Sequence, residues 1–171
     1  MTAAPEAGRY QLDPARSSVA ISHKGMWGLA TVKGTFAAVT GEGEVDPDGT
    51  ATGVIRIEAS SIDTGNSRRD THLRSAAFFD VEQFPIIEFD VLSAAQDASG
   101  GASVQGNLTI RGVSHPQSAT VQVASAEADD LTLTTQFSVD RSTFGVNWNQ
   151  LGTVRGLATV TATLRFTRTA A

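Results

Sequence analysis

The sequence predicts an all-β domain of about eight short antiparallel strands, with one short helical excursion near residues 66–76. Three observations predict this class. Apolar and polar residues alternate with a period of two along almost the whole chain. Turn-forming clusters separate the alternating segments, and a single long polar stretch interrupts them.

The alternation gives each expected strand one apolar face. In one segment Ile87, Phe89 and Val91 alternate with Glu88 and Asp90. Because successive side chains of a strand point to opposite faces, such a segment can bury one face and expose the other. The same pattern recurs in residues 19–23, 54–59, 87–91, 104–110, 131–139 and 158–166.

Turn signals and glycines bear on how the strands are arranged. Residues rich in Gly, Pro, Asp and Ser lie at 46–49, 98–101, 112–116 and 127–130. Strand alternation alone leaves a closed barrel and a two-sheet sandwich open. Glycines inside strands mark the bends and bulges that a closed barrel needs, so we favour the barrel. The glycines in question are Gly34, Gly41, Gly43, Gly53 and Gly106.

Residues 60–85 break the strand pattern, being too long for a hairpin loop and too polar in the middle for a strand. Asn66 or Ser67 is suited to cap a short helix that runs to Leu73 or Ala76. Insertions of this length in a compact domain usually serve a function. We expect three aromatic side chains to pack the segment back onto the barrel: Phe78, Phe79 and Phe84.

Composition excludes several classes of function. A net charge of −5 argues against a nucleic-acid partner, because phosphate binding depends on clustered Lys and Arg. Without cysteine, the chain can form neither a disulfide framework nor a thiolate metal site. It has no apolar run long enough for a membrane span, although transient membrane contact stays open. The chain begins without a signal peptide, so we expect a soluble cytoplasmic protein, or an exported one if a signal has been removed.

Catalytic and metal-binding motifs are weak. The three histidines, His23, His72 and His115, are too far apart for a local chelate, and we interpret His115, which precedes a proline, as a surface residue. There is no nucleophile elbow and no dinucleotide-binding glycine loop. We therefore predict no enzyme, no metal and no cofactor. The alternative is a barrel isomerase or cyclase acting on a lipid, with His23 or Arg141 as the acid–base or polarising group.

Within residues 60–85 an ordered series of motifs resembles the YceI-like family of lipid-binding proteins. The series reads SIDTG at 61–65, RD at 69–70, HLRS at 72–75, FFD at 78–80 and FP at 84–85. Other family landmarks follow in order, namely YQLD at 10–13, His23 at a strand end, VKGTF at 32–36, GNLTIRGV at 106–113 and DRSTFGV at 140–146. The resemblance spans residues 9–168, preceded by an arm, residues 1–8, that we expect to be flexible. Two departures, Asn107 in place of the family's Asp and the polar pair Gln117–Ser118 after Pro116, concern strand edges or turns.

The resemblance implies an eight-stranded antiparallel lipocalin-like barrel whose interior holds a long apolar amphiphile, such as a polyisoprenoid or quinone. Family members are often dimeric, which leaves a homodimer open. We expect the ligand to thread along the barrel between residues that combine bulky and small side chains. The predicted ligand-binding residues are Ile21, His23, Trp27, Phe36, Ile57, His72, Phe79, Phe89, Leu108, Ile110, Phe137, Phe144 and Trp148.

Two further expectations concern this site. Arg68, Arg69, His72 and Arg74 could meet a phosphate or a quinone oxygen at the barrel mouth, but we favour pairing with Asp70, Asp80 and Glu82 that holds the excursion down. A large side chain at a small inward position, Gly106 or Ala162, is expected to block the ligand and leave the barrel folded. Aromatic residues in a barrel can also be plain core, and a filled barrel would serve only as a protein-interaction module.

Overall fold

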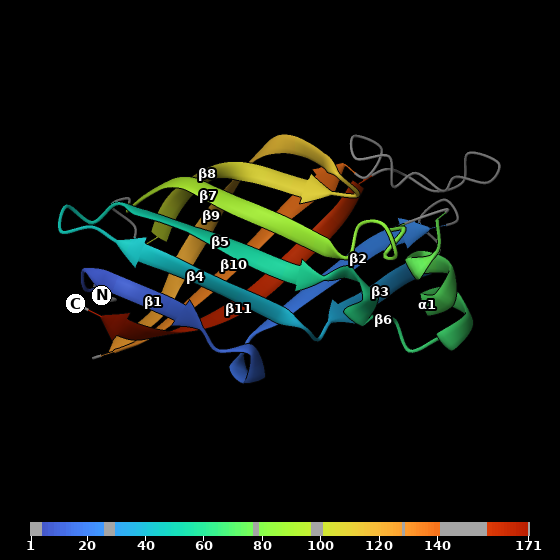
Figure 1. The fold of residues 1–171 in the computed structure, drawn as a ribbon, viewed down its shortest axis with the longest axis horizontal. Helices are drawn as coiled ribbons and strands as arrows, with labels where there is room; N and C mark the ends of the chain where they lie inside the picture. Colours follow the sequence, from blue (N-terminus) through green and yellow to red (C-terminus); the bar gives the residue numbers. More distant parts are fainter. Residues whose placement is uncertain are drawn as a thin grey trace.

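The computed structural model describes residues 5–25, 30–76, 79–96, 101–127, 129–140 and 157–170. Within these ranges, eleven strands form one antiparallel sheet, with a short α-helix and two 3-10 turns between them (Figure 1). In chain order the elements are β1 (Gly8–Leu12), η1 (Pro14–Arg16), β2 (Ser18–Gly25), β3 (Ala30–Phe36), β4 (Val39–Val45), β5 (Ala51–Glu58), η3 (Ala59–Ser61), β6 (Ile62–Asp63), α1 (Ser67–Arg74), β7 (Ile86–Gln96), β8 (Gly101–Ile110), β9 (Val113–Glu127), β10 (Asp130–Asp140) and β11 (Leu157–Ala170).

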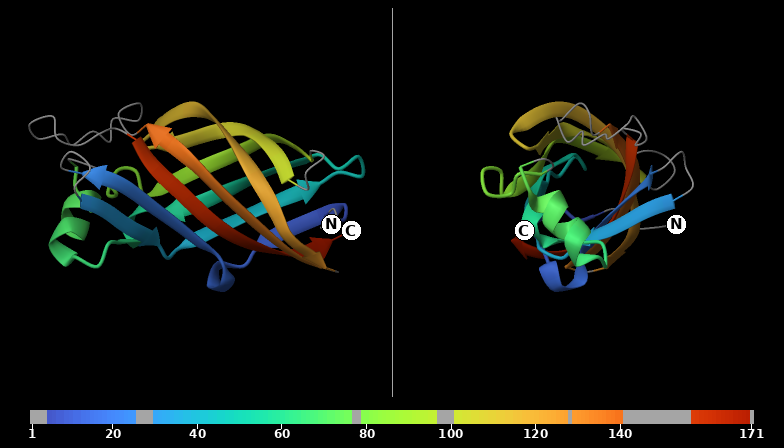
Figure 2. Two further views of the ribbon diagram at one scale, coloured as in Figure 1. Left: turned by 180° about the vertical axis from the view of Figure 1, so that it is seen from behind. Right: turned by 90° about the vertical axis from the view of Figure 1, so that its right-hand side faces the viewer.

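The sheet closes on itself through β11. The C-terminal part of β11 pairs with β1, its N-terminal part pairs with β2, and β1 pairs in turn with β4. β1 and β2 thus act as two halves of one interrupted strand, and β3 and β4 as two halves of the next. Counted this way, the molecule is an eight-stranded antiparallel barrel, as the resemblance implies, and the end-on view in Figure 2 shows its closed outline. Closure leaves few free strand edges.

The interruption between β1 and β2 is the 3-10 turn η1. Asp13 caps it by accepting the backbone N–H of Ala15 at 3.0 Å, and Pro14 supplies a φ suited to a first helical position. Arg16 bonds Asp13 at 2.7 Å and Asp130 of β10 at 3.0 Å. The Arg16 guanidinium beside Asp13 also holds the pKa of that carboxyl below its usual value. The turn therefore bends the first strand while keeping it tied to β10.

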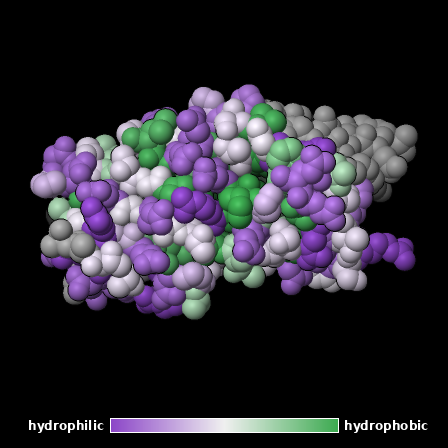
Figure 3. Space-filling model, in the orientation of Figure 1, coloured by the Kyte–Doolittle hydropathy of each residue, from purple (hydrophilic) through white to green (hydrophobic). Residues whose placement is uncertain are grey.

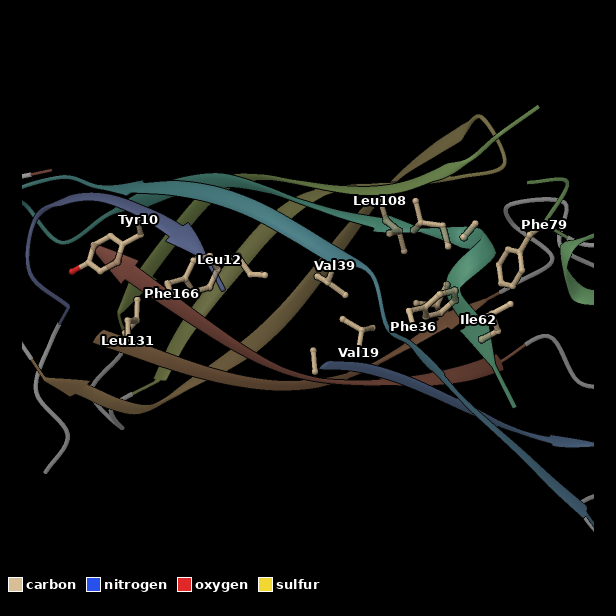
Figure 4. Packing of buried hydrophobic residues seen from close by; sticks show 14 of the residues in the cluster. Tyr10, Leu12, Val19, Phe36, Val39, Ile62, Phe79, Leu108, Leu131 and Phe166 are labelled. Atoms are coloured by element: carbon tan, nitrogen blue, oxygen red, sulfur yellow. The ribbon is translucent and has the colours of Figure 1, made fainter. Parts of the chain in front are cut away.

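The apolar faces predicted from alternation all point into the barrel. Figure 4 shows buried side chains along the whole interior, from Tyr10, Leu131 and Phe166 at one end to Phe36 and Phe79 at the other. We call the first the terminal end, because both chain termini lie there, and the second the helix end, because α1 lies there (Figure 1). On the outside, the face in Figure 3 is mixed, with separate apolar patches among polar ones. The continuous apolar surface is the inner one.

Two of the expected turns can be compared with the structure in detail. The turn at residues 46–49 is present, closed by the N–H of Gly49 donating to Asp46 O at 2.9 Å. The turn expected at 112–116 is wrong in extent, because Arg111 and Gly112 alone form it, both with positive φ as a two-residue hairpin requires. Consequently His115 and Pro116 lie inside β9, and His115 is half-buried instead of a surface residue. The turn expected at 98–101 falls mostly outside the described residues.

Glycine is required at the inner wall because neighbouring strands approach closely there. Gly43 pairs with Gly53, and Val91 lies between Gly53 and Gly106 in the same row across the sheet. A Cβ on Gly53 would lie 2.7 Å from Glu42 O, and one on Gly106 would overlap the carbonyl oxygen of Asp90. The expectation that Gly106 tolerates a large side chain is therefore wrong. The missing side chain of Gly106 makes room for the backbone of the neighbouring strand β7, not for a ligand.

Candidate ligand-binding cavity

The interior of the barrel contains a cavity of about 310 Å³ that is lined by every one of its eight composite strands. Its lining is overwhelmingly aliphatic and aromatic. A volume of this order falls in the range of small-molecule sites, which run from roughly 300 to 1,000 Å³. The inner face of the barrel is therefore incompletely filled by its own side chains.

The cavity is long and narrow. On β11 its lining runs from Ala158 to Phe166. At about 3.4 Å per residue and a strand tilt of about 40°, this stretch extends for roughly 20 Å along the barrel axis. An extended carbon chain advances about 1.2 Å per bond, so the cavity matches a tail of about four isoprene units. A volume of about 310 Å³ spread over this length makes the cavity elongated, as a ligand with a chain-like tail requires.

The structure brings together eight of the thirteen predicted site residues. They come from seven different segments of the chain and all line the cavity: Ile21, Phe36, Ile57, Phe79, Phe89, Leu108, Ile110 and Phe137. His72 lies on α1 and is not among the lining residues. For His23 only the backbone, in β2, is described. Trp27, Phe144 and Trp148 lie outside the described residues, as does Arg141.

Two aromatic pairs shape the tube. The rings of Phe36 and Phe79 meet edge to face with centroids 6.0 Å apart at the helix end. Farther along, the rings of Phe89 and Phe137 lie 6.4 Å apart across the interior. Arrangements of this kind contribute beyond the apolar area they bury, by about 0.5–1.5 kcal/mol each. Phe79 is thus both the residue that docks the excursion on the barrel and part of the cavity wall.

Local hydrogen bonds build the excursion that covers the helix end. Asn66 caps α1 by accepting the N–H of Arg69 at 3.0 Å, so the predicted helix and its cap are both present. Asp70 is buried and accepts two bonds from Thr64, from its N–H at 3.0 Å and its hydroxyl at 2.6 Å. Arg69 donates to the same Thr64 hydroxyl oxygen at 2.9 Å. Leu73 of α1 reaches the cavity lining.

The arginines of this segment hold it down, but by a different route from the one expected. Arg74 donates to the carbonyl oxygens of Ser60 at 2.9 Å and Ile62 at 3.0 Å. Arg69 donates likewise to Thr64 O at 3.2 Å. The expected pairing with carboxylates is wrong for these two residues, since both donate to backbone carbonyl oxygens of residues 60–64. These bonds commit Arg69 and Arg74 to the fold.

Replacing Asp70 by Ala is expected to lower the free energy of unfolding by about 1–3 kcal/mol, because the N–H and hydroxyl of Thr64 would lose their acceptor in a partly buried place. For a domain of this size the melting temperature should fall by about 3–10 °C. Thermal unfolding followed by circular dichroism measures the effect. Arg68→Ala, at an exposed position of the same helix, is the control and should change stability by less than about 0.5 kcal/mol. Equal melting temperatures for the two variants would contradict this account of Asp70.

The prediction of site residues missed the terminal end of the tube. Tyr10, Leu131 and Phe166 line the cavity there. Tyr10 is 5% exposed and donates its hydroxyl to Glu6 O at 2.7 Å, and burial raises the pKa of its phenol. The alternation of Tyr10 and Leu12 with polar neighbours was the available signal. It is too short to distinguish a barrel strand from an arm.

Chemical groups suited to catalysis or metal binding are sparse in this cavity. Among the described residues no cluster of three or more His, Asp and Glu side chains could hold a metal ion. The carboxylates of the lining, Glu42 and Glu44, belong to β4, and Glu42 forms an ion pair with Arg56 at 3.2 Å. The hydroxyl of Thr135, midway along the tube, donates to Thr120 O at 2.9 Å. None of the helices in the described part of the chain combines the length and hydropathy that a membrane crossing requires.

Comparison with known proteins gives relatives along most of the chain. The family model described as "YceI-like domain" matches residues 10–167. A UPF0312 protein of Staphylococcus aureus (strain N315) is 30% identical over 149 residues, which cover 82% of this chain and 84% of the relative. A UPF0312 protein of Vibrio cholerae (serotype O1, strain M66-2) is 29% identical over 116 residues, covering 66% of this chain and 61% of the relative.

Solved structures share the barrel. BcnA of Burkholderia cenocepacia superposes with a TM-score of 0.82 at 23% identity, covering 90% of this chain and 98% of that one. A polyisoprenoid binding domain from Saccharophagus degradans, implicated in plant cell wall breakdown, gives a TM-score of 0.69 at 14% identity and covers 96% and 100%. The YCEI protein of Campylobacter jejuni gives 0.64 at 23% identity and covers 69% and 73%. At these identities the likeness establishes the fold.

Proposed function

The chain belongs to the YceI-like family, and from this membership together with the apolar tube we propose that it binds and carries a long apolar amphiphile, a polyisoprenoid or an isoprenoid quinone. The ligand's tail would lie along the barrel axis, in contact with the inward rows of every strand. The observation that carries the proposal is the cavity: it is long, narrow, and lined almost wholly by apolar side chains.

Burial of the tail supplies the binding free energy in this proposal. Removing methylene groups from water contributes about 0.8 kcal/mol each. A tail of about four isoprene units therefore gains on the order of 10 kcal/mol before the cost of ordering the chain and immobilising the ligand. Such binding needs few polar contacts, which agrees with a lining whose polar groups are few.

Two alternatives are less well supported. A filled barrel that acts only as an interaction module would have no interior space, whereas this barrel contains a cavity of about 310 Å³. A lipid-acting isomerase or cyclase would place an acid–base group against the ligand. Along the described lining the central region is formed by residues such as Val19, Leu133 and Val160, which cannot transfer protons. Carriage, not conversion, fits that surface.

The proposal is tested by stripping the purified protein of lipid and adding geranylgeraniol, a short-chain ubiquinone, or palmitic acid. We expect geranylgeraniol and the quinone to bind with one ligand per chain, with a negative heat-capacity change that reports burial of apolar surface. They should also raise the melting temperature, since a ligand that binds only the native state stabilises it.

The comparison ligand is palmitic acid, whose unbranched tail is of similar length but carries a charged group. Weaker binding of palmitic acid than of geranylgeraniol would support an isoprenoid class. The opposite order would replace it with a fatty-acid carrier. If none of the three ligands binds or stabilises the lipid-free protein, the carrier proposal fails.

A further inference from the structure

The terminal end of the tube is crossed by residues 5–7, here called the N-terminal strap. Pro5 belongs to the lining of the cavity, so the strap touches the space that a ligand would fill. Gly8, with φ of 148°, follows it and begins β1. Residues 1–8 were expected to form a flexible arm, but the described part of this segment has fixed partners on the barrel.

Arg168 on β11 anchors the strap. Its Nε and one terminal nitrogen donate to Ala7 O at 3.0 and 2.7 Å. The other terminal nitrogen lies 3.3 Å from a Glu6 carboxylate oxygen and 3.5 Å from Asp129 on the turn before β10. The Arg168 side chain is 20% exposed, so these bonds are partly shielded from water. One side chain on β11 thus joins the strap to the turn before β10, and both are far from the strap in the sequence.

Tyr10 is the second anchor and lines the tube at its terminal end. Its hydroxyl donates to Glu6 O at 2.7 Å, and its ring lies at the terminal end near Leu131 and Phe166 (Figure 4). Because the Tyr10 hydroxyl donates to the strap, only the apolar part of the Tyr10 ring faces the cavity. Burial raises the pKa of the phenol, which keeps it neutral over the physiological range. A hydrocarbon end is the chemical group that such a surface accepts.

We propose that Tyr10 and the N-terminal strap form the floor of the tube and set the longest isoprenoid tail that the protein can bury. This inference rests on the proposed function and adds to it a limit on ligand length. A tail of about four isoprene units ends against Tyr10 and Pro5, and a longer tail must either leave its surplus in water or displace the strap. Displacing the strap breaks the hydrogen bonds that Arg168 donates to Ala7 O and that Tyr10 donates to Glu6 O.

The test compares tail lengths in competition. Lipid-free protein is mixed with equal amounts of geranylgeraniol and the longer solanesol, and native mass spectrometry measures the ratio of the two bound ligands. The wild-type protein should favour geranylgeraniol. Arg168→Met, which keeps an apolar stem but removes the donors, should raise the bound ratio of solanesol to geranylgeraniol about tenfold, the effect of about two more buried methylene groups.

Two further variants and a control complete the test. Tyr10→Phe retains the ring and loses one bond to the strap, so the ratio should rise about threefold. Tyr10→Ala removes the floor itself and should raise the ratio at least as much as Arg168→Met. Arg165→Met, on the same strand and outside the strap's contacts, should leave the ratio unchanged.

The outcomes separate the two proposals. If the wild-type protein binds geranylgeraniol and the ratio is the same in folded Arg168→Met and Tyr10→Phe, the floor inference is overturned and the carrier proposal stands. If the wild-type protein binds neither alcohol, the carrier proposal and the floor both fail. Should Tyr10→Ala not fold, the other two variants decide the result.

Discussion

Replacing Ala162 by Phe is expected to reduce the affinity for an isoprenoid ligand by at least about a hundredfold while the barrel stays folded. Ala162 lies midway along β11, is 5% exposed, and lines the cavity between its strand neighbours Thr135 on β10 and Val19 on β2. An added ring there would occupy the space of roughly one isoprene unit, and loss of about four buried methylene groups accounts for the change. Titration of the lipid-free variant with geranylgeraniol measures it.

The matched control is Thr161→Phe, which places the same ring one residue away on the exposed face of β11. Its affinity should equal that of the wild-type protein, because neighbouring residues of a strand face opposite sides. Both variants should retain the β-sheet circular dichroism signal. An Ala162→Phe variant that is folded and binds with wild-type affinity would show that the tube is not the binding site.

Replacing Gly106 by Ala is expected to lower the free energy of unfolding by about 3 kcal/mol, the largest effect on stability that we predict for so small a change. The new methyl group would overlap the carbonyl oxygen of Asp90, and it would also lie 3.0 Å from the Phe89 ring. The Asp90 carbonyl belongs to the backbone of the paired strand β7 and can move only if the β7–β8 pairing is disturbed. Chemical denaturation measures the loss.

Gln105→Ala, at the neighbouring exposed position of β8, serves as the control and should change stability by less than about 0.5 kcal/mol. The glycine variant should retain the denaturant dependence of a cooperative unfolding transition but with a lower midpoint. A Gly106→Ala protein as stable as the Gln105→Ala protein would contradict the close approach of β7 and β8.

Local patterns in the sequence predicted the strands and the helix because each depends on a few neighbouring residues. Alternation identified the inward rows of β5, β7, β8, β10 and β11, and Asn66 marked the start of α1. The hairpin at Arg111–Gly112 was placed too late, since the His115–Pro116 pair is more typical of a turn than of a strand. Over residues 113–120 β9 pairs only with β8 among the described strands, and a proline is tolerated at such an edge.

The parts that the sequence could not predict depend on contacts between distant segments. A glycine inside a strand, such as Gly106, can make room either for a ligand or for the backbone of a neighbouring strand. The sequence is the same in both cases, and only the pairing of β8 with β7 shows that Gly106 serves the second purpose. Arg69 and Arg74 lie near carboxylates in the sequence but reach backbone carbonyls in space. The strap depends on a contact between Ala7 and Arg168, which are separated by almost the full chain.

The central claim, that the barrel interior holds a long apolar ligand, is tested most directly by native mass spectrometry of the protein as purified, followed by organic extraction of whatever it carries. The account predicts a mass above that of the chain by one isoprenoid alcohol or quinone, absent from Ala162→Phe and present in Thr161→Phe. A bare chain mass in the wild-type protein that persists after incubation with geranylgeraniol and a short-chain ubiquinone would contradict it.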